Sequence, residues 1–347
     1  MDALLNISDS NILPMTHEEI LKELKNKKYR TVYFLMGEEP YFIDLVTNYI
    51  EKNVLTEEEK TFNQTVLYGK DTDVPGIINA ARRFPMMSNH QVIIVREAQL
   101  LDKIEDLIHY VNAPLASTLL VINYKYKKLD KRKKLFKAIE QMGVILDSRR
   151  LYEDKVPAWI DSYLITRGKK IDPKAGMILT EFLGSDLGKI VNELDKLLLI
   201  LPEQEGIINP KHIEENIGIS KDYNNFELNN ALAQRNVLKA NRIVKYFENN
   251  PRANPFTLTI ASIYNFYSKL LNYHFLKDRS RSNVAIVLKI NPYFVQEYER
   301  AARIYNPSKT VQVISLLREF DLKSKGYGNV SSSHGDLLKE LVYKILH

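Results

Sequence analysis

Cysteine is absent from this 347-residue sequence, which excludes disulfides, thiol catalysis and zinc–thiolate sites. Long hydrophobic runs are missing too, and none approaches the roughly 20 apolar residues of a membrane-spanning helix. The first residues lack the basic and then apolar layout of a secretory signal. The charge is mildly basic, with 49 Lys and Arg against 43 Asp and Glu, which permits a nucleic-acid partner without requiring one. We therefore expect a soluble protein in the reducing cytoplasm.

A phosphate-binding loop is also missing, although the strand that would lead into one is present. Residues 31–37 read as a buried β-strand ending in glycine, and Glu38, Glu39 and Pro40 follow. In a P-loop this turn is rich in glycine and ends in Gly-Lys-Ser/Thr, whose amides and lysine hold the phosphates. Here two carboxylates add negative charge and proline removes an amide donor, so the turn repels phosphate. The pattern predicts a nucleotide-machine fold that does not itself hold a nucleotide.

Two architectures follow one another along the chain. Residues 1–148 alternate strand-like and helix-like segments, which predicts a parallel sheet covered on both faces. The expected strands are 31–36, 62–68, 91–95, 117–122 and 143–146, and the expected helices are 16–26, 40–52, 74–83 and 131–139. Later apolar residues follow helical periods, which predicts a small helical domain over 149–220 and a second one over 221–347, where a weak strand remains an alternative. The fold class is therefore α/β followed by all-α.

Groups suited to catalysis or metal binding are few. Glu38 and Glu39 resemble a carboxylate pair for metal binding or acid–base work, but no histidine or further aspartate lies nearby. We favour a solvated helix N-terminus, where acids interact well with the helix dipole. None of the seven histidines forms an i, i+4 pair or an H-E-x-x-H motif. We predict no catalytic residue, no metal and no cofactor.

Two segments indicate contact with a partner. Phe84, Pro85, Met86 and Met87 occupy a connection between a helix and a buried strand, where polar residues are expected. They form either an adaptable apolar binding surface or a closure of the sheet's core. The run 125–134 holds seven basic residues after the fourth strand, where open α/β sheets place ligand sites. It is either a solvated helix start or a contact for DNA or a partner, with candidates Lys127, Lys128, Lys131, Arg132 and Lys133.

The order of these segments resembles the delta subunit of bacterial DNA polymerase III. The resemblance rests on the series 32–44, 82–88 and 92–98, on Lys128-Leu129-Asp130-Lys131-Arg132-Lys133-Lys134-Leu135, and on the later segments 192–197, 226–228 and 321–323. It extends over nearly the whole chain. It implies a clamp-loader subunit with an AAA+-like N-terminal domain, a small helical lid domain and a helical collar domain.

The resemblance also implies a function and partners. Delta subunits bind the ring-shaped sliding clamp (the beta subunit) and open one of its interfaces for loading onto primed DNA. ATP is hydrolysed by the tau/gamma subunits, and a delta-prime subunit completes the loader. In the family, two adjacent large apolar residues before the third strand plug a pocket on the clamp. The matching residues here are Met86 and Met87, with Phe84 and Pro85 beside them, where the family often has Leu-Phe.

Two other functions were weighed against this one. An active AAA+ ATPase needs a phosphate cradle, but the pairs Gly69-Lys70 and Gly168-Lys169 lack both the preceding glycines and the following Ser/Thr. A stand-alone nucleic-acid-binding protein would use the run 125–134. Nothing resembles the carboxylate pair with which a polymerase holds two metal ions, so polymerase activity would belong to this chain only through its complex.

Overall fold

The computed structural model describes residues 14–202, 205–328 and 331–347. The chain divides into two compact units, 1–151 and 152–347, which we call the sheet unit and the helical unit. The first boundary predicted from the sequence, at 148, lies close to this division. The further division of the second part at residue 220 stays a prediction.

The sheet unit is built on five parallel strands in the order β2-β3-β4-β1-β5. Their bounds are β1 Val32–Gly37, β2 Gln64–Tyr68, β3 Gln91–Arg96, β4 Thr118–Lys125 and β5 Val144–Ser148. Strand β1 lies between β4 and β5, with Val32 opposite Leu120 and Tyr33 opposite Val144. Every residue of β1 is buried, as expected for a strand that is covered on both faces.

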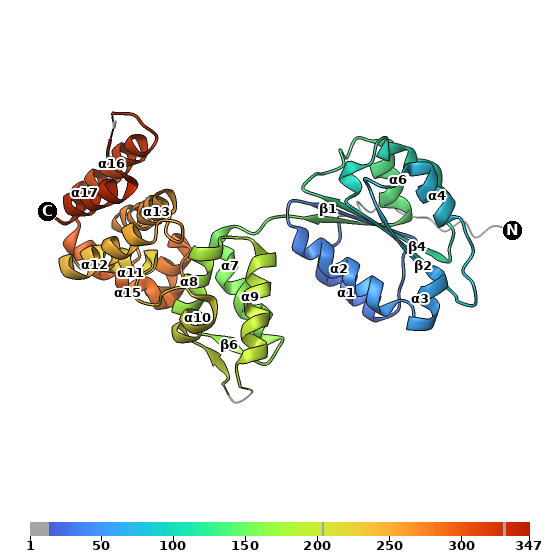
Figure 1. The fold of residues 1–347 in the computed structure, drawn as a ribbon, viewed down its shortest axis with the longest axis horizontal. Helices are drawn as coiled ribbons and strands as arrows, with labels where there is room; N and C mark the ends of the chain where they lie inside the picture. Colours follow the sequence, from blue (N-terminus) through green and yellow to red (C-terminus); the bar gives the residue numbers. More distant parts are fainter. Residues whose placement is uncertain (1–13, 203–204, 329–330) are drawn as a thin grey trace. The chain divides into compact units, whose positions relative to one another are not determined.

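Helices cover both faces of this sheet, with α1 and α2 on one side and α4 and α6 on the other (Figure 1). Their bounds are α1 His17–Lys25, α2 Pro40–Asn53, α3 Glu57–Asn63, α4 Val74–Ala81, α5 Ile108–Val111 and α6 Lys134–Met142. Thr16 and Glu19 close a reciprocal capping box at the start of α1. The predicted α/β sheet with a large helical part after it is confirmed.

Two predicted boundaries in the sheet unit were wrong. The strand expected over 62–68 begins at Gln64, because residues 57–63 form helix α3, which the sequence did not predict. The helix expected over 131–139 begins at Lys134. Asp130 accepts a hydrogen bond from the backbone N–H of Arg132 at 2.9 Å, and this turn delays the start of the helix.

The helical unit contains α7 Val156–Ile165, α8 Pro173–Leu183, α9 Leu187–Ile200, α10 Pro210–Ile217, α11 Asn225–Ala233, α12 Val237–Asn249, α13 Phe256–His274, α14 Arg281–Leu288, α15 Val295–Ile304, α16 Pro307–Ser324 and α17 His334–Leu346. Two short parallel strands, β6 Lys170–Ile171 and β7 Ile207–Ile208, were not predicted. Buried side chains of α11 to α17 form one core. The described residues of 226–347 contain no strand, so the alternative of a weak strand there is not supported.

Buried charges connect the helices of this unit across residue 220. The carboxylate of Glu227 in α11 is 5% exposed and pairs with Lys174 of α8 and Lys239 of α12. A buried carboxylate is stable only when such partners compensate for its lost hydration. Helix α8 is therefore tied to helices on the far side of the predicted domain boundary.

Candidate partner-binding site

The turn after β1 is closed by backbone contacts at the carboxyl end of the sheet. Gly37 has a φ of 133°, and a Cβ placed on it would lie 2.0 Å from the carbonyl oxygen of Ser148. Its N–H donates to the carbonyl of Lys127 at 3.1 Å, and its own carbonyl accepts from Tyr126 N–H at 2.8 Å. Neighbouring backbone thus fills the space where a phosphate-binding loop would open.

Glu39 completes this closure. Its side chain is the N-cap of α2 and accepts a hydrogen bond from Tyr41 N–H at 3.1 Å. The hydroxyl of Ser148 donates to the Glu39 carbonyl at 2.6 Å. The predicted helix N-terminus is confirmed, but Glu39 is not solvated: it is only 4% exposed, whereas Glu38 is exposed. A protein carboxylate therefore occupies the helix N-terminus where a nucleotide phosphate would bind.

The basic run at the same end of the sheet is largely paired within the protein. Lys125 belongs to β4 and lies 2.7 Å from Asp44. Among the candidate contacts, Lys128 pairs with Asp147, Arg132 with Asp130, and Lys133 with Glu105, while Lys127 donates to the carbonyl of Gln99. The acidic partners of Lys125, Lys128, Arg132 and Lys133 thus offset part of the local positive charge of the run.

The pair between Arg132 and Asp130 is local to the run. The guanidinium of Arg132 and its backbone N–H both donate to Asp130, and they lower the pKa of that carboxyl to about 2. Both side chains are exposed, so this pair adds little to folding stability.

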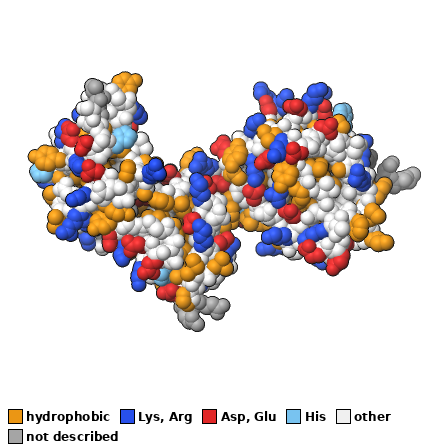
Figure 2. Space-filling model, in the orientation of Figure 1, with side chains coloured by type: hydrophobic (Ala, Val, Ile, Leu, Met, Phe, Trp, Pro, Cys, Tyr) orange, Lys and Arg blue, Asp and Glu red, His pale blue; other side chains and the backbone are white. Residues whose placement is uncertain are grey.

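The segment Phe84–His90 forms a loop at the opposite, amino end of the sheet, between α4 and β3. Met87 is fully exposed, Phe84 is 76% exposed and Met86 is 61% exposed, while Pro85 is partly buried. Figure 2 shows hydrophobic side chains gathered at this loop, beside α3. The exposure of these three side chains excludes closure of the sheet's core as their role. A cluster of large apolar side chains in solvent is typical of a protein-binding surface.

Two buried side-chain amides hold this loop through hydrogen bonds to its backbone and to the end of α4. The Asn63 side chain, 3% exposed, accepts from Met86 N–H at 2.7 Å and donates to the Met86 carbonyl at 2.9 Å. The Gln91 amide, 5% exposed, donates to the carbonyls of Arg83 at 2.6 Å and Ala81 at 3.1 Å. The sequence did not point to either residue.

Phe62 adds a further exposed ring next to Asn63, with 70% of its surface accessible. The sequence pattern placed Phe62 in the strand expected over 62–68, and because apolar side chains are common in strands, its exposure was not predicted. Its position at the end of α3 puts one more apolar side chain near the loop.

Comparison with known proteins agrees with this arrangement. The family model for the delta subunit of DNA polymerase III matches residues 33–148, a range that runs from β1 to the end of β5 and includes the loop. The sheet unit is therefore similar to that family. DNA polymerase III subunit delta of Bacillus subtilis (strain 168) is 25% identical over 320 residues, which cover 88% of this chain and 91% of the relative.

A solved structure extends the likeness to the fold of both units. The Bacillus subtilis DNA clamp loader delta protein matches with a TM-score of 0.53 and 22% identity, over 95% of this chain and 99% of that protein. The chain is thus similar in sequence to the delta subunit of DNA polymerase III and in fold to a clamp loader delta protein.

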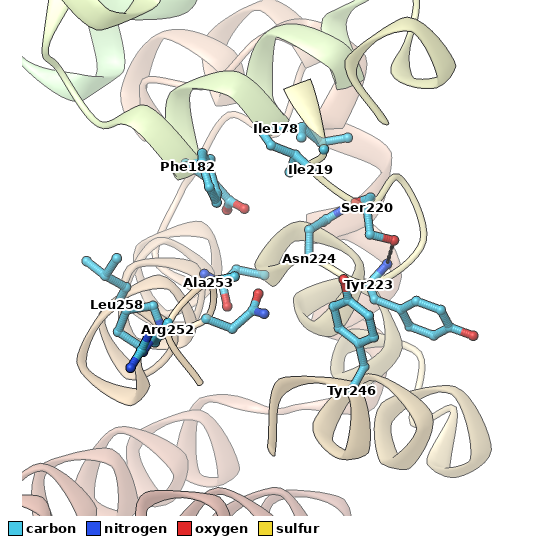
Figure 3. Close-up of a pocket in the computed structure, with 15 residues that line it drawn as sticks. Ile178, Phe182, Ile219, Ser220, Tyr223, Asn224, Tyr246, Arg252, Ala253 and Leu258 are labelled. Carbon is cyan, nitrogen blue, oxygen red and sulfur yellow. Dashed lines mark hydrogen bonds between the residues drawn. The ribbon is translucent and has the colours of Figure 1, made fainter. Parts of the chain in front are cut away.

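The helical unit contains a separate cavity. A cavity of about 190 Å³ lies in the helical unit between α8, the loop before α11 and the start of α13 (Figure 3). Its lining includes Phe182, Tyr223, Arg252 and Leu258, with a single carboxylate, Glu181. Burial raises the pKa of Glu181 to about 7, against hydrogen bonds that favour its charged form. The lining of this cavity contains no histidine or second carboxylate, although Glu181 also lines a smaller cavity together with Glu297.

The described residues, 14–202, 205–328 and 331–347, form neither a metal-binding cluster nor a membrane-spanning helix. Within these ranges, no group of three or more His, Asp or Glu side chains is placed to hold a metal ion. None of the helices formed by the same residues is long and apolar enough to cross a membrane.

Proposed function

We propose that this chain is a delta subunit of the clamp loader, that it binds the sliding clamp (the beta subunit) through Met86 and Met87, with Phe84 and Pro85 beside them, and that it opens the ring. The observation that carries the proposal is the loop itself, in which large apolar side chains are exposed on a hydrogen-bonded backbone. A surface of this kind loses little conformational freedom when a partner covers it.

Burial of these side chains supplies the energy for the proposed opening. Each methionine contributes roughly 1.5–3 kcal/mol when it moves from water into an apolar pocket. If the pocket accepts them only in the open or strained ring, this difference in affinity shifts the clamp towards opening. Unbranched methionine adapts to the shape of a pocket, which suits a site that changes as the ring opens.

ATP hydrolysis is assigned to other subunits of the loader. The crowded glycine at position 37, the buried carboxylate of Glu39 and the missing amide of Pro40 support this assignment, because together they leave no cradle for a phosphate. We infer that the chain works beside tau/gamma ATPases and a delta-prime subunit in the cytoplasm. It would use an AAA+-like domain over 1–148, a lid over 149–220 and a collar over 221–347.

DNA contact within the complex is proposed for Lys127, Lys128, Lys131, Arg132 and Lys133. Since several of these cations already have acidic partners, we expect weak DNA binding by the isolated chain. This expectation separates the loader subunit from a stand-alone nucleic-acid-binding protein, whose affinity would be high and would fall steeply with salt.

The decisive experiment measures binding of the purified chain to the sliding clamp of the same organism, without ATP. We expect binding by the intact chain and a loss of about 100-fold in affinity for Met86→Ala/Met87→Ala. Met142→Ala is a matched control, because Met142 is also exposed in the sheet unit but lies at the end of α6. No binding by the intact chain, or unchanged binding by the double variant, would refute the proposal.

A further inference from the structure

The side-chain amide of Asn63 holds the backbone of Met86 much as a neighbouring β-strand would. Its Oδ1 accepts from Met86 N–H at 2.7 Å, and its Nδ2 donates to the Met86 carbonyl at 2.9 Å. Only an amide side chain offers a donor and an acceptor side by side in this way, and asparagine is the shorter of the two that do. Because Asn63 is buried, water does not compete for these bonds.

The loop needs such support at its tip. Met87 has a φ of 51°, in the left-handed region that residues with a Cβ rarely adopt. It is fully exposed, so packing of its own side chain does not hold this conformation. The two bonds to Met86, the residue before it, therefore set the direction in which Met87 points.

The base of the loop is held separately. The Gln91 amide bonds the carbonyl of Arg83 and the hydroxyl of Thr118, the latter at 2.8 Å. These contacts tie the beginning of the loop to strands β3 and β4, and they do not involve α3. Loss of Asn63 would consequently release the tip while the base stays in place.

Helix α3 reaches the loop at a second point, beyond Met87. The carboxylate of Glu59 accepts from Thr56 N–H at 2.9 Å, and this bond and the nearby Ser88 hydroxyl lower the pKa of the carboxyl. Asn63 thus bonds the residue before Met87, and Glu59 of the same capped helix lies near the residue after it.

We propose that Asn63 is a positioning residue for clamp binding: it sets the Met86–Met87 pair in its binding geometry before the clamp arrives. The inference rests on the proposed function, in which these two methionines contact the clamp. Asn63 itself makes no contact with the partner in this scheme. Its effect comes from sparing the partner the entropic cost of ordering the loop.

The test is a double-mutant cycle in which the clamp affinity of the whole chain is measured for each variant. Asn63→Ala should weaken binding about tenfold, since two buried hydrogen bonds are lost. The same substitution in the Met86→Ala/Met87→Ala background should change affinity less than about twofold, because a positioning residue acts only through the side chains that it positions. Asn63→Asp keeps the acceptor for Met86 N–H and should give an intermediate loss.

Asn53→Ala is the matched control. Asn53 is the last residue of α2 and donates to the carbonyl of Tyr49 four residues earlier, as Asn63 does to Glu59, but it has no bond to the loop. It should leave clamp affinity unchanged. Hydrogen exchange should accelerate at the Met86 amide in Asn63→Ala, much less in Asn63→Asp, which keeps the acceptor for that amide, and not in Asn53→Ala.

The outcomes separate the two proposals. Equal losses for Asn63→Ala in both backgrounds would indicate general destabilisation and overturn the positioning role. Full affinity in Asn63→Ala, with affinity still lost in the methionine double variant, would overturn the role of Asn63 and leave the proposed function standing. Full affinity in the methionine double variant would overturn both. If Asn63→Ala fails to fold, unchanged affinity in Asn63→Asp would overturn the inference.

Discussion

The two ends of the parallel sheet are built from similar contacts and serve opposite purposes. At the carboxyl end, where α/β sheets usually bind their ligands, Gly37, Glu39 and Ser148 close the turn with buried groups. At the amino end, Asn63 and Gln91 hold a loop whose side chains face solvent. The comparison teaches that a parallel sheet can fill the end where ligands usually bind and present exposed apolar side chains at the other end.

The largest expected effect comes from breaking the closed end. Gly37→Ala places a Cβ 2.0 Å from the Ser148 carbonyl oxygen, so β1 and β5 must separate. We expect the free energy of unfolding of the sheet unit to fall by about 3 kcal/mol or more. Met87→Gly is the matching substitution at the amino end of the sheet, and it should change the free energy of unfolding by less than about 1 kcal/mol. Urea unfolding of both variants tests this, and equal effects would contradict the contrast between the two ends.

A smaller effect is expected from Glu39→Ala. The substitution removes the N-cap of α2, which should cost about 1 kcal/mol of folding stability. Glu38→Ala, at the exposed neighbour, should stay within about 0.5 kcal/mol of the unchanged protein. Thermal or urea unfolding provides the values.

The same two variants also test whether charge alone closes the phosphate site. Neither should bind ATP in equilibrium dialysis, because Gly37 stays crowded and Pro40 still lacks an amide. ATP binding by Glu39→Ala would mean that the carboxylate, and not the backbone, keeps the site closed.

The smallest effect concerns the basic run at the closed end. Arg132→Ala should return the pKa of Asp130 from about 2 towards the ordinary range near 3.8. Since the folded-state pKa is depressed, the Arg132 contact favours folding above the ordinary pKa, and this contribution disappears as pH falls through about 2. A carboxyl-detected NMR titration measures the change, with Lys131→Ala as the control. An unchanged Asp130 pKa in Arg132→Ala would show that the pair does not form.

Sequence patterns predicted the strongly apolar elements and missed those that lack apolar periodicity. The strand expected over 91–95 corresponds to β3, since Val92, Ile93, Ile94 and Val95 are all buried. Helix α3 was missed because it reads Glu-Glu-Glu-Lys-Thr-Phe-Asn, with one apolar residue that is itself exposed. Strands β6 and β7 have two residues each, too few for any alternation.

The site was predicted in part for the same reason. Phe84, Met86 and Met87 were conspicuous as apolar residues in a connection, but the sequence left their exposure open. The sequence did not point to Asn63, because the backbone that it bonds belongs to Met86, 23 residues later in the chain. A polar residue that bonds distant backbone gives no periodic signal.

The position of β5 in the sheet has a consequence for synthesis of the chain. Strand β1 is the first of the five strands to be synthesised, yet one of its two partners, β5, is the last strand of the unit. The hydroxyl that seals Glu39 belongs to Ser148, which is 109 residues further along. Until β5 and Ser148 have been synthesised, one edge of β1 has no partner strand, and the turn after β1 lacks the hydrogen bond from Ser148 to Glu39. The sheet unit is therefore completed by its final residues, in a single closing step over a long loop.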